Sequence, residues 1–177
     1  KKSKPYPYPQ LSLVTNGGKG IACSNKHYGI PANLIQPTSG KDMGDGWETA
    51  RHPNRPPVLI KDPVTNLVDS PLMDWAVIKL GMGGADSVSR IILDTKHFRG
   101  NYPESVQVEG CWLNKDNESD DALSTSTPDS IDTSVQWFPL LQRTRMGPDR
   151  EHFFDRESGQ IVNSTRKVSH VRVSIFP

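Results

Sequence analysis

Short apolar runs separated by polar, proline-rich and glycine-rich segments make up the chain, and no stretch keeps the 3.6-residue apolar period of a long helix. β-Branched and aromatic residues gather in several of these runs. We predict strands at Leu11–Thr15, Trp75–Leu80, Val88–Asp94, Val106–Trp112, Trp137–Leu141 and Val168–Phe176. Many short strands joined by turn-rich connections predict an all-β, antiparallel sandwich or barrel.

The last of these runs shows the strand period most clearly. Val171, Val173 and Ile175 share one face, and polar side chains that include His170 occupy the other. This alternation is typical of a half-buried strand, and it predicts that His170 faces outward.

Three segments between the runs are expected to be irregular. Lys1–Gln10 is basic and has alternating prolines, which favours an extended linker. His52–Pro71 is proline-rich and is interpreted as a long surface loop, and Asn114–Ser134 is rich in Ser, Thr and Asp, which predicts a mobile loop. We expect residues 11–177 to form one domain, and none of the three segments to hold a rigid catalytic site.

Composition excludes several classes of function. The 177 residues suit one domain, and a net charge of +1 predicts no general attraction to nucleic acid or to an anionic membrane. No apolar run has the roughly 18 residues of a membrane-spanning helix. Cys23 and Cys111 are far apart, which excludes a disulfide framework and fits a reducing compartment. No metal-ligand spacing, phosphate-binding loop or dinucleotide fingerprint is present.

The first candidate cluster for chemistry is Gly44–His52, which gathers two carboxylates, a guanidinium, an imidazole and an indole. If its glycine turn leads into extended backbone, Trp47 and Glu48 face opposite sides. Arg51 can then hold a carboxylate with two parallel hydrogen bonds, and that carboxylate belongs either to a substrate or to Glu48. In a purely structural alternative Trp47 lies in the core and Arg51 pairs with Glu48 or Asp45.

The second candidate cluster, Asp94–Asn101, follows directly from a predicted strand. Strand ends that run into loops are where rigid scaffolds present reactive groups. Asp94 and His97 can form an acid/base pair because imidazole titrates near neutrality. In the structural alternative Asp94 caps a turn and Asn101 adopts a left-handed conformation. His152 and the other histidines are weaker candidates.

At these clusters the chain resembles the allantoicase family. The matching segments are Asn33–Pro37, Asp45–Thr49 with Arg51, Asp74–Gly81, Ile92–Asn101, Val108–Cys111, Gly147–Asp149 and Val168–Val171. They follow one another in the family's order and cover nearly the whole chain from about His27 onward. The amino-acid sequence of these segments is more similar to the second of the family's two tandem repeats than to the first.

The resemblance implies that this chain is one repeat of a longer protein, folded as a jelly-roll β-sandwich similar to galactose-binding and discoidin modules. Compared with the family, insertions are expected at about 53–72 and 114–134, both on the surface. The implied partners are the other repeat and further copies of the protein. We expect no cofactor and assign no metal ligand. The implied compartment is the cytoplasm, with the peroxisome as the alternative.

The implied reaction is the hydrolysis of allantoate to ureidoglycolate and urea. Arg51 is then expected to bind the substrate carboxylate, and Glu48, Asp94 and His97 to transfer protons, with acid and base unassigned. Further substrate contacts are expected from Asp45, Trp47, Thr49, Thr95 and Asn101. The alternative from another functional class is a non-catalytic sandwich that supports its partner repeat or binds a small ligand.

Overall fold

The computed structural model describes residues 6–113 and 135–177, where the chain is all-β with three short 3-10 helices. The strands are β1 (Lys19–Cys23), β2 (Asp74–Lys79), β3 (Arg90–Asp94), β4 (Ser105–Cys111), β5 (Phe138–Arg145), β6 (Glu151–Asp155) and β7 (His170–Phe176). The helices are η1 (Val14–Asn16), η2 (Pro31–Ile35) and η3 (Met43–Asp45). The expected Asn114–Ser134 loop and the first five residues of the expected linker lie outside the described residues.

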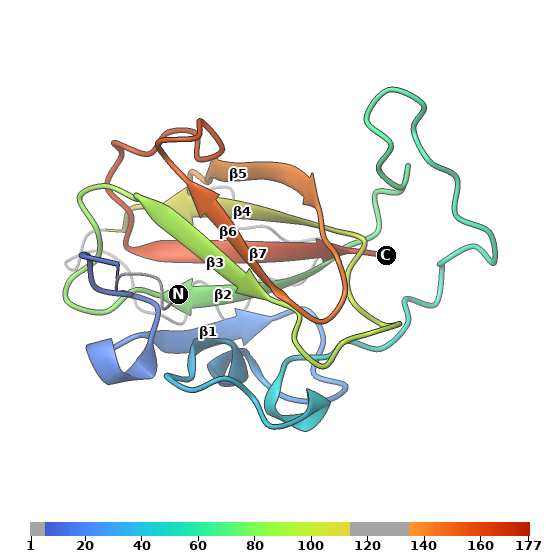
Figure 1. The fold of residues 1–177 in the computed structure, drawn as a ribbon, viewed down its shortest axis with the longest axis horizontal. Coiled ribbons are helices and arrows are strands. Elements are labelled where there is room, and N and C mark those ends of the chain that lie inside the picture. Colours follow the sequence, from blue (N-terminus) through green and yellow to red (C-terminus); the bar gives the residue numbers. More distant parts are fainter. Residues whose placement is uncertain (1–5, 114–134) are drawn as a thin grey trace, which may run out of the picture.

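The strands form two antiparallel sheets. Five strands pair in the order β1-β2-β7-β4-β5, and β3 pairs with β6 in a second, smaller sheet. Figure 1 shows β3 and β6 crossing in front of the larger sheet. The predicted antiparallel β-sandwich is therefore confirmed, and no described helix is long and apolar enough to cross a membrane.

The main core lies between the two sheets. Val106 and Val108 of β4 pack with Leu141 of β5 and with Phe154 of β6, and all four are buried. Ile91 of β3 packs against the same cluster from the smaller sheet. Burial of one such side chain contributes about 1.5–3 kcal/mol, so this contact is the main force that joins the layers.

The second face of the larger sheet is also covered, which makes one expectation wrong. His170 is only 4% exposed, whereas the alternation in its strand predicted an outward position. The reason is that Leu113 and Val135 pack on this face, against Cys111, which lies opposite His170 in the sheet. On this face Arg172 forms an ion pair of 2.7 Å with Glu109, and both side chains are largely buried. In β7, the alternation of apolar and polar side chains therefore marks a polar face that is covered rather than exposed to solvent.

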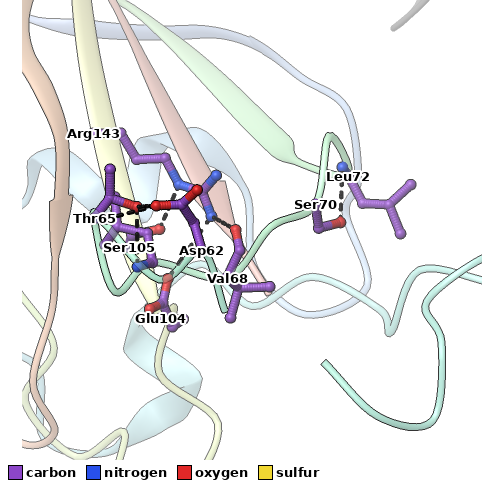
Figure 2. Close-up of polar contacts among 9 residues, drawn as sticks. Asp62, Thr65, Val68, Ser70, Leu72, Glu104, Ser105 and Arg143 are labelled. Atoms are coloured by element: carbon purple, nitrogen blue, oxygen red, sulfur yellow. Dashed lines mark hydrogen bonds and ion pairs between the residues drawn. The ribbon is translucent and has the colours of Figure 1, made fainter. Parts of the chain in front are cut away.

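Part of the expected surface loop at 53–72 docks on that same face (Figure 2). Asp62 accepts hydrogen bonds from the backbone and hydroxyl of Thr65, which closes a turn. Val68 is 3% exposed, and its carbonyl accepts a hydrogen bond of 2.8 Å from Arg143 of β5. Arg143 also donates to the hydroxyl of Ser105 at 2.8 Å. The segment 61–70 is therefore an anchored hairpin-like loop.

Strand prediction failed at three places. Leu11–Thr15 is not a strand, since η1 begins at Val14. Gly17 caps the end of this helix with a φ of 89°, which requires glycine-like freedom. Sequence reasoning missed β1, where Gly20 lets the backbone of η2 approach closely. It also missed β6, a short run with charged residues at both ends. In all three segments, a prediction from the local content of apolar residues gave the wrong secondary structure.

Candidate functional site

The first cluster is an extended segment that follows η3. Asp42 caps η3 by accepting a hydrogen bond of 2.8 Å from the amide of Gly44. Trp47 is 7% exposed, and its indole N–H donates to the carbonyl of Asn25 at 2.9 Å. Glu48 then forms an isolated antiparallel bridge with Tyr28. Because side chains alternate along extended backbone, the buried indole leaves the Glu48 carboxylate on the other side.

The second cluster is the loop that follows β3. The carboxylate of Asp94 accepts a hydrogen bond of 2.7 Å from the amide of Lys96, as in the structural alternative of a capped turn. Thr95 is 5% exposed, and its hydroxyl donates to the carbonyl of Gly147 at 2.7 Å. His97 is half-buried and has a left-handed backbone, with φ of 71°. Thr95 therefore lies inside the protein, whereas Asp94 and His97 reach the surface.

Direct contacts join the two clusters. The side-chain amide of Asn101 donates a hydrogen bond of 2.9 Å to Oε1 of Glu48. Nε2 of His97 lies 2.8 Å from the carbonyl oxygen of Gly40, just ahead of η3. Glu48 and His97, which are far apart in sequence, are thus tied to one surface by these two bonds.

Two further contacts fix the same junction. Lys96 donates to the hydroxyl of Ser39 at 2.9 Å. The ring of Phe98 lies so close to Gly46 that a Cβ at that position would come within 2.9 Å of it. Gly46 is therefore needed for the close approach of the two clusters.

Arg51 follows Glu48 by three residues in the first cluster. Its side chain is exposed, and in residues 6–113 and 135–177 no ion pair or hydrogen bond joins it to Glu48 or Asp45. Asp45 instead accepts a hydrogen bond of 2.7 Å from the amide of Lys41. One half of the structural alternative is therefore confirmed, because Trp47 lies in the core. The other half, an ion pair of Arg51 with Glu48 or Asp45, is not found in the described residues.

A cavity of about 1160 Å³ runs from the junction into the space between the sheets. Its lining includes every candidate residue of both clusters: Asp45, Trp47, Glu48, Thr49, Arg51, Asp94, Thr95, His97 and Asn101. This volume exceeds the roughly 300–1,000 Å³ that a small-molecule pocket takes. The contacts between the clusters, rather than the cavity as a whole, therefore define the candidate site.

A third loop, 147–150, contacts the second cluster. This loop was not singled out as a site from the sequence. Asp149 accepts hydrogen bonds from the amide of His97 at 2.8 Å and from Nε of Arg99 at 3.1 Å. The bond from the His97 amide is the main cause that lowers the pKa of the Asp149 carboxyl. The only sequence signal for this loop was its place among the segments of the family resemblance.

His152 of β6 holds that loop in place. Its Nε2 accepts a hydrogen bond of 2.9 Å from the amide of Gly147, and its Nδ1 lies 3.2 Å from the carbonyl oxygen of Leu93. This network assigns the proton to Nδ1 in the neutral ring. Burial lowers the pKa of His152, which favours the same neutral form. Among the described residues, no group of three or more His, Cys, Asp or Glu side chains is arranged to hold a metal ion.

A sequence model of the allantoicase repeat matches residues 9–177, nearly the whole chain. The chain belongs to the allantoicase family. A probable allantoicase of Pseudomonas savastanoi pv. phaseolicola is 34% identical over 171 residues, which is 95% of this chain and 42% of that protein. The allantoicase of Saccharomyces cerevisiae is 35% identical over 167 residues, 94% of this chain and 39% of that protein.

Solved structures agree with the sequence relatives. The crystal structure of the Saccharomyces cerevisiae allantoicase superposes with a TM-score of 0.67 and 34% identity, over 94% of this chain and 39% of that one. The resemblance predicted from the sequence motifs is therefore confirmed. The chain spans about two fifths of the length of the relatives it matches, as expected for one repeat.

Proposed function

We propose that the protein to which this repeat belongs hydrolyses allantoate to ureidoglycolate and urea, and that the junction of the two clusters forms part of its active site. The family supports the reaction, and the hydrogen bond between Asn101 and Glu48 supports the place, because it gathers the polar groups of both motifs. Each cluster alone lacks the full set of groups that allantoate requires. The other repeat is the proposed partner.

Arg51 is the proposed binding residue for the substrate carboxylate. Allantoate keeps its carboxylate throughout the reaction, so that group serves for binding and orientation. A guanidinium holds a carboxylate through two charge-assisted hydrogen bonds. Arg51 supports this role because it is exposed and, within the described part of the chain, has no carboxylate of its own to neutralise. Asp45, Thr49 and Asn101 are proposed to contact the ureido groups.

Glu48, His97 and Asp94 are proposed to transfer the protons. The bond between the α-carbon and a ureido nitrogen breaks, and that nitrogen takes a proton from a general acid as urea leaves. A water molecule supplies the new hydroxyl group and gives its proton to a general base. Such transfers each contribute a factor of about 10²–10⁴ in rate. Trp47 and Thr95, which are buried, are proposed to support these groups from beneath.

Urea release from allantoate by the full-length protein tests the proposal. Glu48→Gln keeps the acceptor oxygen for Asn101 but removes the charge, and we expect the rate to fall by roughly 10²-fold or more. Glu157→Gln, a surface change far along the chain from both clusters, is the matched control and should retain the wild-type rate. If this repeat only supports its partner, Glu48→Gln will release urea as fast as the control.

We also propose that the protein works in the cytoplasm, with the peroxisome as the alternative, and forms homo-oligomers. No disulfide joins Cys23 and Cys111, which fits a reducing compartment. Size measurement of the full-length protein in solution checks the oligomeric state.

A further inference from the structure

The backbone of His97 is held in a conformation that non-glycine residues rarely adopt. Its φ of 71° lies in the left-handed region. Such a residue costs on the order of 1–3 kcal/mol and persists only where its surroundings hold it. The surroundings of His97 must therefore supply a specific restraint.

The carboxylate of Asp149 supplies such a restraint, beside the turn that the amide of Phe98 closes on the carbonyl of Thr95 at 3.0 Å. Its Oδ1 accepts a hydrogen bond of 2.8 Å from the amide of His97, and its Oδ2 accepts one of 3.1 Å from Nε of Arg99. In return the amide of Asp149 donates to the carbonyl of Phe98 at 3.0 Å. Asp149 itself is left-handed, with φ of 49°. Two strained residues thus fix each other across loops that are about fifty residues apart in sequence.

The restraint determines how the imidazole is presented. Nε2 of His97 lies 2.8 Å from the carbonyl oxygen of Gly40, and a carbonyl can only accept. In the neutral ring the proton therefore sits on Nε2, which leaves Nδ1 unprotonated. Within the described residues no hydrogen bond occupies Nδ1, so that nitrogen is able to take a proton from a substrate or a water molecule.

We propose that Asp149 is a positioning residue for His97. Its carboxylate holds the His97 backbone so that the ring keeps Nε2 on the Gly40 carbonyl and presents Nδ1 to the reacting groups. This inference rests on the proposed function, in which His97 transfers a proton. It assigns Asp149 a role through its hydrogen bonds to His97 and Arg99, and no contact with substrate.

Asp149→Gly in the full-length protein tests the inference with the least disturbance. Glycine adopts a positive φ without cost, so the variant removes the carboxylate and leaves the local backbone relaxed. We expect kcat for urea release from allantoate to fall by roughly tenfold to a hundredfold, while KM changes much less. Asp149→Asn keeps an acceptor oxygen and tolerates the left-handed region, so it should restore most of kcat. Arg99→Ala removes the other partner of Asp149 and is the control, with kcat near wild type.

Nitrogen NMR of ¹⁵N-histidine-labelled protein gives a readout that does not depend on activity. The wild type should show His97 in one neutral tautomer, with the proton on Nε2, and His97→Gln identifies its signals. Asp149→Gly should show a mixture of tautomers, and Asp149→Asn and Arg99→Ala should resemble the wild type. An unchanged His97 tautomer and unchanged kcat in Asp149→Gly would overturn the inference. If the full-length wild type releases no urea from allantoate, the proposed function fails, and the tautomer in Asp149→Gly still decides the positioning role.

Discussion

The side-chain amide of Asn101 donates a hydrogen bond of 2.9 Å to Oε1 of Glu48, between residues 53 positions apart in the chain. Asn101 belongs to the loop after β3, and Glu48 to the extended segment after η3. The bond joins the two polar clusters into one surface. It also leaves the second oxygen of Glu48 available, because a carboxylate has acceptor capacity for several hydrogen bonds.

Asn101→Ala should therefore impair the reaction more than the fold. A hydrogen bond to a charged group contributes about 1.5–3 kcal/mol, which corresponds to roughly a tenfold to hundredfold loss of kcat/KM for allantoate. Asn101 is exposed, so the melting temperature should change little. Steady-state urea release and thermal unfolding on one preparation check this. A large loss of thermal stability with unchanged kinetics would show that the bond is only structural.

The neutral His152 predicts how stability depends on pH. Its pKa in the folded protein is lowered from 6.5, first because the ring is buried. The unfolded state therefore binds a proton at higher pH than the folded state does. The stabilising contribution is complete above about pH 6.5 and is lost as the pH falls below that value.

His152→Gln isolates this effect. Glutamine offers an oxygen that is able to accept the hydrogen bond from Gly147, but it does not titrate. We expect the melting temperature of the variant to fall less steeply between pH 7 and pH 5 than that of the wild type. Differential scanning calorimetry across this range measures both slopes. Equal slopes would assign the acid sensitivity to other groups.

Arg143 should control the loop 61–70 on the second face of the large sheet (Figure 2). Arg143→Met removes the hydrogen bonds to Val68 and Ser105 and leaves Glu104 without its ion-pair partner. The expected loss in the free energy of unfolding is about 1.5–3 kcal/mol. Amide exchange of the loop should also become faster, because its anchor is lost.

The exposed Arg145 on the same strand supplies the control for that change. Arg145→Met should leave both the free energy of unfolding and the exchange rates of the loop near wild type. Adding Glu104→Gln to Arg143→Met should recover part of the stability, because it removes the uncompensated carboxylate. Equal exchange in the Arg143 and Arg145 variants would mean that the loop has another anchor.

The sequence predicted β2, β3, β4 and β7 because their apolar runs are short, bounded by turn residues and rich in β-branched side chains. It failed at β6, where Phe153 and Phe154 stand between charged residues and no local period is visible. That strand exists because it pairs with β3 and buries Phe154 in the core. His170 was misplaced for a related reason, since the cover over its face comes from segments that local pattern cannot locate.

The candidate site was predictable in its members but not in its geometry. Glycines and strand ends marked the two clusters, and both reach one surface through Asn101 and Glu48. From the sequence, Thr95 was expected to contact substrate. In the structure its side chain is buried and its hydroxyl donates a hydrogen bond to the carbonyl of Gly147, which no local sequence pattern indicates. Asp149 illustrates the same limit, since its role depends on a left-handed His97 that no residue spacing reveals.

We propose that this repeat supplies the cation that binds the carboxylate of allantoate, and kcat/KM of Arg51→Lys in the full-length protein is the decisive measurement. Lysine keeps the charge but offers no planar pair of donors. We expect kcat/KM to fall roughly tenfold to a hundredfold with an unchanged melting temperature, while the exposed control Arg145→Lys matches the wild type in both. Unchanged kcat/KM with a lowered melting temperature would contradict the claim and make Arg51 a structural brace.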